Sequence, residues 1–259
     1  EESLRTARGL HGDRDHPHVS SALGALGLLS LKRGELEKAK LYLEESLRMN
    51  RALHGDKDHP DVGATLCCLG QLSQQEGDVE RAKEYLEESW RIKRALHGDS
   101  DHPHVCSVLR ALGQLSLETG ESEKAKQYLE ESLRVDRALH GDRDHPGVVA
   151  TLQALGVLSQ QTGDLEKAKQ YLEESFRIGR SLNGDRDHPD VGATLFALGK
   201  LSQEEGDVEK AKQYLEEALR IVRAQHKDRD HVDVGGVLFT LGQLSLQTGD
   251  SDEAKQYWE

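Results

Sequence analysis

Residues 54–62 read HGDKDHPDV, and close copies of this stretch recur along the chain. The second histidine of each copy stands at position 16, 59, 102, 145, 188 or 231, so every step is 43 residues without insertion or deletion. A constant period between about 20 and 50 residues is typical of proteins built from stacked repeats. The stretch therefore belongs to a repeat, and its chemistry has to be interpreted within that repeat.

Each repeat contains two amphipathic helical patterns and two breaks. In the second repeat, apolar residues from Val62 to Leu72 recur at spacings of three and four, which is the period of an α-helix. Gly77 follows this pattern, where a glycine commonly ends a helix in a left-handed conformation. A second pattern of about 19 residues begins after Asp78, whose carboxylate is placed to cap the new helix. The sequence therefore predicts an all-α protein made of helix pairs.

The HGDxDHP stretch fits a joint between one repeat and the next. Gly55 allows a turn after the preceding helix, and Pro60 suits a first helical turn, where no backbone N–H is needed. Asp58 stands where an N-cap carboxylate is expected. All 13 histidines lie in or beside these joints, so metal binding or proton sensing is an alternative interpretation. Because Asn183 interrupts one histidine column and the six copies are unequal, we expect no metal and no cofactor.

Composition argues against several classes of function. The formal charge of −13 disfavours nucleic acid, because binding a phosphate backbone depends on Lys and Arg. We expect no membrane association, since no apolar run approaches the ~20 residues of a membrane span, and we find no signal-peptide pattern. Cys67, Cys68 and Cys106 are odd in number and lack zinc-ligand spacing, which favours reduced thiols and a cytoplasmic location.

Six residues of the second repeat resemble the tetratricopeptide repeat (TPR) family in type and spacing: Leu66, Leu69, Gly70, Ala82, Leu86 and Ser89. The resemblance covers the whole chain. It implies a right-handed superhelical α-solenoid of stacked antiparallel helix pairs. We expect a single array over residues 1–259, with a partial helix at 1–10, repeats at 15–57, 58–100, 101–143, 144–186 and 187–229, and a partial repeat at 230–259.

The repeats depart from the family pattern in three places. The family's Trp and Tyr positions on the first helix hold Leu66 and Ser73, and its closing Pro is Arg94. Without that proline the second helix can continue, which accounts for a period longer than the usual length of about 34 residues.

Long repeats with Asp-His-Pro-x-Val joints look most like the kinesin light chain subgroup of this family. That subgroup carries paired Asn residues on its first helix, which engage cargo peptides. The matching positions here hold Cys67 and Cys68, or Arg110 and Ala111, so the ligand class of the subgroup is not carried over.

Comparison of the six repeats separates constant positions from variable ones. Leu23, Leu26, Gly27 and their equivalents never vary, as expected where helices pack closely. Variation is concentrated on one stripe of the first helix, which we call the groove stripe. Its first position holds Gly24, Cys67, Arg110, Gln153, Phe196 and Phe239, and its second holds Leu28, Gln71, Gln114, Val157, Lys200 and Gln243. Ser20, Gly63, Cys106, Val149, Gly192 and Gly235 vary on the preceding turn.

In TPR arrays this stripe lines the concave groove, so the resemblance implies a peptide-binding surface. The alternative is that the stripe is simply an exposed face, whose residues vary by neutral drift without selection for a ligand. The outer face of the second helix, KAKQYLEES, is also expected to be exposed but hardly varies, which favours selection on the groove stripe. Within the stripe, Phe196 and Phe239 are typical anchors for an apolar side chain, and Arg110 is suited to an acidic or amide group.

Three functions remain open at this stage. The first is a scaffold that binds an extended or helical peptide segment of a protein partner. The second is a structural repeat protein, because the chain starts and stops inside second-helix patterns and is either a segment of a longer array or able to join head to tail. An enzyme is the least favoured, since catalysis needs one unlike constellation of groups. We therefore expect no catalytic residues.

Overall fold

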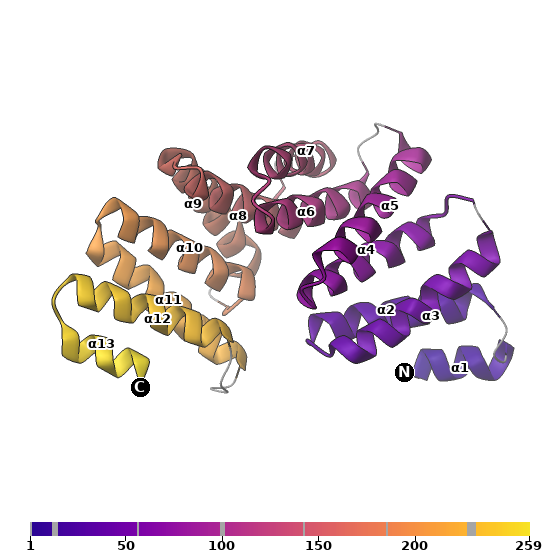
Figure 1. Ribbon diagram of the computed structural model, residues 1–259, viewed down its shortest axis with the longest axis horizontal. Helices are drawn as coiled ribbons and strands as arrows, with labels where there is room; N and C mark the ends of the chain where they lie inside the picture. The colour runs from indigo at the N-terminus through magenta and orange to yellow at the C-terminus, as the bar shows by residue number, and fades with distance from the viewer. Residues whose placement is uncertain are drawn as a thin grey trace. The chain divides into compact units, whose positions relative to one another are not determined.

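The computed structural model describes residues 2–11, 15–55, 57–98, 102–141, 143–184, 186–226 and 232–259. These residues form thirteen α-helices and no strand (Figure 1), which confirms the all-α prediction. None of these helices combines the length and the apolar character needed to cross a membrane. The helices are α1 (Glu2–His11), α2 (Pro17–Lys32), α3 (Leu36–His54), α4 (Pro60–Gln75), α5 (Val79–His97), α6 (Pro103–Glu118), α7 (Ser122–His140), α8 (Pro146–Gln161), α9 (Leu165–Asn183), α10 (Pro189–Glu205), α11 (Val208–His226), α12 (Val232–Gln247) and α13 (Ser251–Trp258).

The chain divides into an N-terminal part, residues 1–139, and a C-terminal part, residues 140–259, and each is described by itself. In the N-terminal part α2 pairs with α3 and α4 with α5, and in the C-terminal part α8 pairs with α9, α10 with α11 and α12 with α13. Turns of two or three residues join the members of each pair, so the paired helices run antiparallel. First helices of successive repeats also pack together, α2 with α4, α4 with α6, α8 with α10 and α10 with α12.

The constant Leu-Gly positions hold the two helices of a pair together. Leu66 is buried, and a Cβ atom built on Gly70 would lie 2.6 Å from Cγ of Leu86 on the partner helix. Real Cβ atoms essentially never approach so closely, so only glycine allows this helix spacing. The same contact recurs in each helix pair whose glycine is described, and Trp258 replaces the leucine against Gly242 in the last one. The constant positions therefore fill the interior, as predicted.

Glycines in the left-handed region close the breaks between helices at ten positions in the described part of the chain. Gly77 has φ +79° after α4, and Gly55 has φ +63° after α3. These conformations are strained for residues with a Cβ atom. Asp78 begins the second helix as predicted, because its carboxylate accepts a hydrogen bond from the backbone N–H of Arg81 at 3.2 Å.

The capping residue of the joint differs from the prediction. His59, and not Asp58, is the N-cap of α4, and its Nδ1 accepts a hydrogen bond from the backbone N–H of Asp61 at 3.2 Å. The residue before a proline favours extended backbone, and His59 with φ −133° and ψ 140° therefore occupies the N-cap position before Pro60. Asp58 instead forms an ion pair with Arg91 at 3.0 Å.

The same arrangement recurs in other joints. His16, His145 and His188 are N-caps, whereas Asp15, Asp144 and Asp187 pair with arginines of the second helices. The equivalents Asp101 and Asp230 lie outside the described residues, as does the whole joint at 227–231. The predicted capping role of Asp58 and these equivalents is therefore wrong wherever the joint is described.

Candidate functional site

The groove stripe of the N-terminal part lies on three neighbouring helices. Its members are Gly24 and Leu28 on α2, Cys67 and Gln71 on α4, and Arg110 and Gln114 on α6. Leu28 is 38% exposed, and Gln114 is also exposed. Gly24, Gln71 and Arg110 are half-buried. Cys67 is only 5% exposed and packs within a hydrophobic cluster, so it offers no surface to a ligand.

The groove stripe of the C-terminal part carries the aromatic members. They are Gln153 and Val157 on α8, Phe196 and Lys200 on α10, and Phe239 and Gln243 on α12. Phe239 is 56% exposed, with its ring centroid 6.1 Å from that of Trp258. Phe196 is half-buried against the hydrophobic cluster of its neighbours, and the ammonium group of Lys200 lies 5.9 Å from the centre of its ring. Within this part of the stripe, Phe239 is therefore the exposed aromatic residue and Lys200 the exposed cation.

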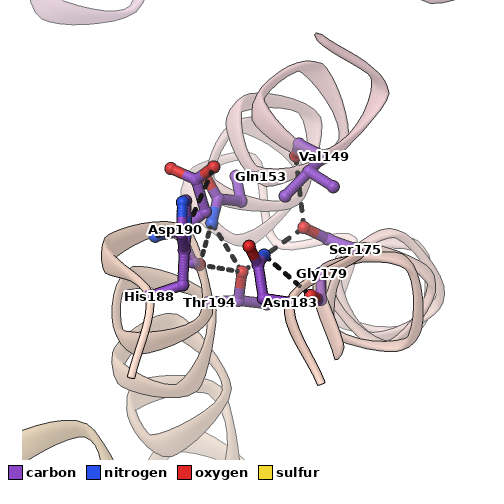
Figure 2. A network of polar contacts seen from close by, with 8 residues as sticks. All are labelled: Val149, Gln153, Ser175, Gly179, Asn183, His188, Asp190 and Thr194. Carbon is purple, nitrogen blue, oxygen red and sulfur yellow. Dashed lines mark hydrogen bonds and ion pairs between the residues drawn. The ribbon is translucent and has the colours of Figure 1, made fainter. Parts of the chain in front are cut away.

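The first stripe position lies at the contact between first helices of successive repeats. Figure 2 shows Gln153 of α8 reaching α10, where its Nε2 donates to the Asp190 carbonyl oxygen at 2.6 Å and to Thr194 Oγ1 at 2.5 Å. Cys67 and Phe196 also pack against neighbouring side chains. Ser20 and its equivalents, one helical turn before the first stripe position, are buried except for Gly235. Sequence variation alone did not separate these packing positions from the exposed ones.

A second variable position was missed by the sequence comparison. It lies on the second helices and holds Asn50, Lys93, Asp136, Gly179 and Val222, all of them buried. Lys93 Nζ donates to Ser107 Oγ at 3.4 Å, and burial lowers the pKa of this amine. The signal was present in the sequence, because the position changes from amide to cation, anion, glycine and valine while the residue before it stays apolar and the residue after it is always Arg.

Two cavities open along the groove stripe of the N-terminal part. One of about 250 Å³ lies between α2 and α4, with Gly24, Leu28, Asn50, Thr65 and Cys68 among its lining residues. The other, of about 450 Å³, is lined by Leu28, Leu31, Lys32, Gln71, Gln74, Gln75 and Glu118. The two share Leu28, so they form neighbouring hollows beside an exposed apolar side chain.

The joint histidines form stacked pairs. The rings of His54 and His59 are 3.4 Å apart and nearly parallel at 7°, and His97 and His102 stack at 3.7 Å. Burial, and then the neighbouring His59, lowers the pKa of His54. His54, His59 and Asp61 each offer one ligand atom within 4.8 Å of the others, but His59 Nδ1 already accepts the Asp61 N–H. The histidines thus have a structural role in closing the joint, and the absence of a metal stays a prediction.

Ion pairs link neighbouring second helices on the outer face. Arg8 pairs with Glu45 at 2.8 Å and Arg51 with Glu88 at 2.9 Å, and the C-terminal part repeats this pair at equivalent positions. Each exposed pair contributes little stability by itself. Their repetition nevertheless gives a structural reason for the constancy of this face. The contrast between a variable stripe and a constant outer face is therefore weaker support for ligand selection than the sequence suggested.

The cysteines show no sign of activation. Burial raises the pKa of Cys68 to about 11 and that of Cys106 to about 12, and the nearby Asp136 adds to the shift of Cys106. Both groups are protonated thiols at neutral pH, and the thiolate is the nucleophilic form. Cys67, Cys68 and Cys106 are all free, in agreement with the predicted reduced thiols.

Comparison with known proteins identifies the repeat. Residues 58–138 and 148–224 match one tetratricopeptide repeat profile, and residues 19–61 and 236–259 match two others of the same description. No curated protein matches the chain in sequence.

Solved structures resemble the chain over most of its length. BtubC (BKLC) from P. vanneervenii is 25% identical with a TM-score of 0.67, over 89% of this chain and 91% of that one. A Podosopora anserina putative kinesin light chain with nearly identical TPR-like repeats is 23% identical with a TM-score of 0.60, over 81% and 98%. Cut9-Hcn1 of the APC/C reaches a TM-score of 0.73 over 99% of this chain and 41% of that one, at 15% identity, which indicates the fold alone.

Proposed function

Because the chain belongs to the tetratricopeptide repeat family, we propose that it is a non-enzymatic scaffold that binds an extended or helical segment of a protein partner along the groove stripe. The observation that carries the proposal is the pair of cavities beside exposed Leu28 in the N-terminal part. Ligand sites are concave and mostly apolar, with a few placed polar groups. The smaller hollow has this character, whereas the larger one is lined mainly by polar side chains.

The two parts of the chain offer different chemistry to such a partner. In the N-terminal part Gln71, Arg110 and Gln114 can donate hydrogen bonds, which suits amide or acidic groups. In the C-terminal part Phe239 offers an exposed ring and Lys200 a cation, which suits an apolar side chain near an acidic one. The net charge of −13 disfavours nucleic acid as the partner. The three free cysteines favour a reducing compartment such as the cytoplasm.

Affinity capture from the native cell tests the proposal. The test variant replaces exposed stripe residues by alanine at Leu28, Gln71, Gln114, Lys200, Phe239 and Gln243. The matched control replaces Leu41, Leu96 and Leu182, which are exposed apolar residues on second helices. We expect the wild-type chain and the control to capture the same partner and the stripe variant to lose it. Equal capture by all three chains would rule out the groove stripe as the binding surface.

Head-to-tail association is the alternative function. Its support is the exposed aromatic pair of Phe239 and Trp258, which are 56% and 46% exposed. A heterologous contact of this kind does not close and produces filaments. Light scattering over a range of concentrations distinguishes the two functions: mass that grows with concentration supports association, and a constant monomer mass contradicts it.

A further inference from the structure

The smaller of the two cavities along the groove stripe is lined by a buried polar side chain. It lies between α2 and α4, and Gly24 leaves it open because glycine has no side chain to fill it. Asn50 of α3 lines the cavity and is 2% exposed. Its Oδ1 is buried and meets no hydrogen-bond donor among the described residues. A buried polar atom without a partner carries a desolvation cost, which a hydrogen-bond donor that reaches this oxygen would relieve.

Neighbouring hydroxyl groups fix the orientation of the Asn50 amide. Ser46 Oγ donates to the Ser20 carbonyl oxygen at 2.9 Å, and Thr65 Oγ1 donates to the Asp61 carbonyl oxygen at 2.8 Å. Both hydroxyl protons are therefore used. The Asn50 Nδ2 group is then the one that faces the hydroxyl oxygens, at 3.3 Å from Thr65 and 3.5 Å from Ser46. If the amide were rotated by half a turn, Oδ1 would face two hydroxyl groups whose protons are already donated to backbone carbonyl oxygens.

The C-terminal part shows what chemistry fills the equivalent space. Gln153 occupies the position of Gly24 in its own repeat, and Asp190 and Thr194 occupy those of Asp61 and Thr65. The carboxamide of Gln153 lies across the gap between α8 and α10 and donates to the Asp190 carbonyl oxygen and the Thr194 hydroxyl (Figure 2). Thr194 Oγ1 in turn donates to that carbonyl oxygen, as Thr65 does in the N-terminal part.

The junctions at Gly24 and Gln153 share one framework of acceptors, with Thr65 and Thr194 at the same repeat position. At the Cys67 and Phe196 junctions Val108 and Val237 replace this threonine, and Cys67 and Phe196 pack against apolar neighbours. At Gly24 the framework acceptors remain and the side chain is missing. The buried Asn50, where the Gln153 junction has Gly179, adds one more acceptor.

We propose that the cavity at Gly24 is a subsite for the carboxamide of a glutamine side chain from the partner segment. This inference rests on the proposed function of the groove stripe. The two N–H groups of the amide would donate to acceptors that the cavity presents, the Asn50 Oδ1, the Asp61 carbonyl oxygen and the Thr65 hydroxyl. A carboxylate of the same shape is rejected, because it has no proton to donate to these oxygens. A lysine ammonium would have to lose its hydration inside the cavity, which disfavours it.

Substitution at Gly24 tests the chemistry of the cavity without a partner. A Cβ atom at Gly24 meets only Ser46 Oγ, at 3.4 Å, so larger side chains can enter. Gly24→Gln should reproduce the Gln153 arrangement, whereas Gly24→Met has a similar length without a donor. Both remove a helix glycine, so they share the gain in helix propensity. We expect the Gln variant to have the higher Tm. A Tm equal to or below that of the Met variant would overturn the assignment.

A positional peptide library tests the subsite in binding. Peptides carrying Gln, Glu, Met or Lys at each position are selected on wild-type protein, on Gly24→Gln and on Gly24→Ala. We expect wild-type and Gly24→Ala to enrich Gln over Glu and Met at one position by about tenfold or more, since a site built for hydrogen bonds rejects analogues that cannot make them. Gly24→Gln should lose this preference and keep those at other positions.

The outcomes separate the two proposals. Peptides that bind with the same preferences to wild-type protein and Gly24→Gln contradict the glutamine subsite and leave the scaffold function standing. Enrichment of Lys in place of Gln likewise contradicts the carboxamide assignment. If no peptide is enriched on wild-type protein, both the scaffold function and the subsite fail, even where the Tm comparison supports the cavity chemistry.

Discussion

Glycine has two different roles on the first helices, and only the surroundings of each residue distinguish them. Gly70 allows close contact with Leu86, since an added Cβ atom would lie 2.6 Å from Leu86 Cγ. Gly24 faces a cavity, with Ser46 Oγ at 3.4 Å as the one neighbour that an added Cβ would meet. The first glycine is constant among the repeats and the second is replaced freely.

This contrast predicts opposite effects of the same substitution. Gly70→Ala should lower the free energy of unfolding by about 1–3 kcal/mol, because it overpacks a closed interface. Gly24→Ala should raise it by up to about 1 kcal/mol through better helix propensity. Denaturant unfolding followed by circular dichroism measures both values. Equal changes in the two variants would show that the Leu-Gly contact does not determine the helix spacing.

The aromatic residues of the groove stripe also differ in their suitability for a binding test. Phe196 packs against the hydrophobic cluster, so its truncation should weaken the fold as well as any binding. Phe239 is 56% exposed and is the better probe. Phe239→Ala should cost about 2 kcal/mol or more of partner binding if the ring is an anchor.

Isothermal titration with the captured partner measures the effect of Phe239→Ala. Leu41→Ala is its matched control, because Leu41 is an exposed apolar residue on a second helix. Unchanged affinity in the Phe239 variant would remove this ring from the binding surface.

At the scale of the elements, stacked histidine rings lie at the joint between repeats. The stacked rings of His54 with His59 and of His97 with His102 lie against each other at the end of one helix and the start of the next. Burial is the largest cause that lowers the pKa of His54 and of His97, and the stacked neighbour is the second. The folded joint therefore favours the uncharged form of both imidazoles.

Because the pKa values of His54 and His97 are lowered by folding, the stability of the protein should depend on pH. Both pKa values lie below 6.5 in the folded state, so the unfolded chain takes up protons first as the pH falls. The contribution of the two histidines to stability is complete above about pH 6.5 and is lost as the pH falls through the lowered pKa values. We expect the Tm to decrease between pH 7 and 5, and to decrease less in a His54→Asn, His97→Asn double variant.

Asparagine is a suitable replacement because Asn183 stands at the equivalent position, where its Nδ2 donates to the Gly179 carbonyl oxygen at 2.9 Å. The carboxylates are the same in both chains, so their protonation affects both melting curves alike. A pH dependence that is identical in the two chains would contradict a role for the stacked pairs.

At the scale of the whole molecule, cohesion comes from contacts between neighbouring helices. Within each part of the chain every helix pair packs on the next through buried leucines and alanines, and repeated ion pairs join the outer faces. The free energy of unfolding of such a protein is approximately the sum of the intrinsic stabilities of its repeats and the interface energies between neighbouring repeats. We therefore expect the repeats to pack without a structural metal ion.

A chelator should therefore leave thermal unfolding unchanged. Differential scanning calorimetry with and without EDTA measures the Tm, and added zinc completes the comparison. Loss of Tm with chelator and recovery with zinc would instead indicate a structural ion at clusters such as His54, His59 and Asp61.

The period, the helix pairs and their breaks were predictable because they depend on local rules. Helical periodicity, glycine at positive φ and proline in the first turn act over a few residues, so the stretch at 54–62 was sufficient to locate the joint. The capping residue was mistaken by one position. Asp58 and His59 both have acceptor side chains, and the extended backbone imposed by Pro60 selects the histidine.

The amino-acid sequence by itself determined the family, the helix pairs and the positions at which repeats differ. Only the tertiary structure decided which variable residues are covered. Gly24, Cys67 and Gln153 share one stripe position, yet the first borders an open cavity, the second is core and the third bridges two helices. The physical reason is that the exposure of a stripe residue depends on the side chains of the neighbouring repeat, through their volume and their hydrogen-bonding groups. Those side chains lie tens of residues away in the chain and contact the stripe only when the helices pack.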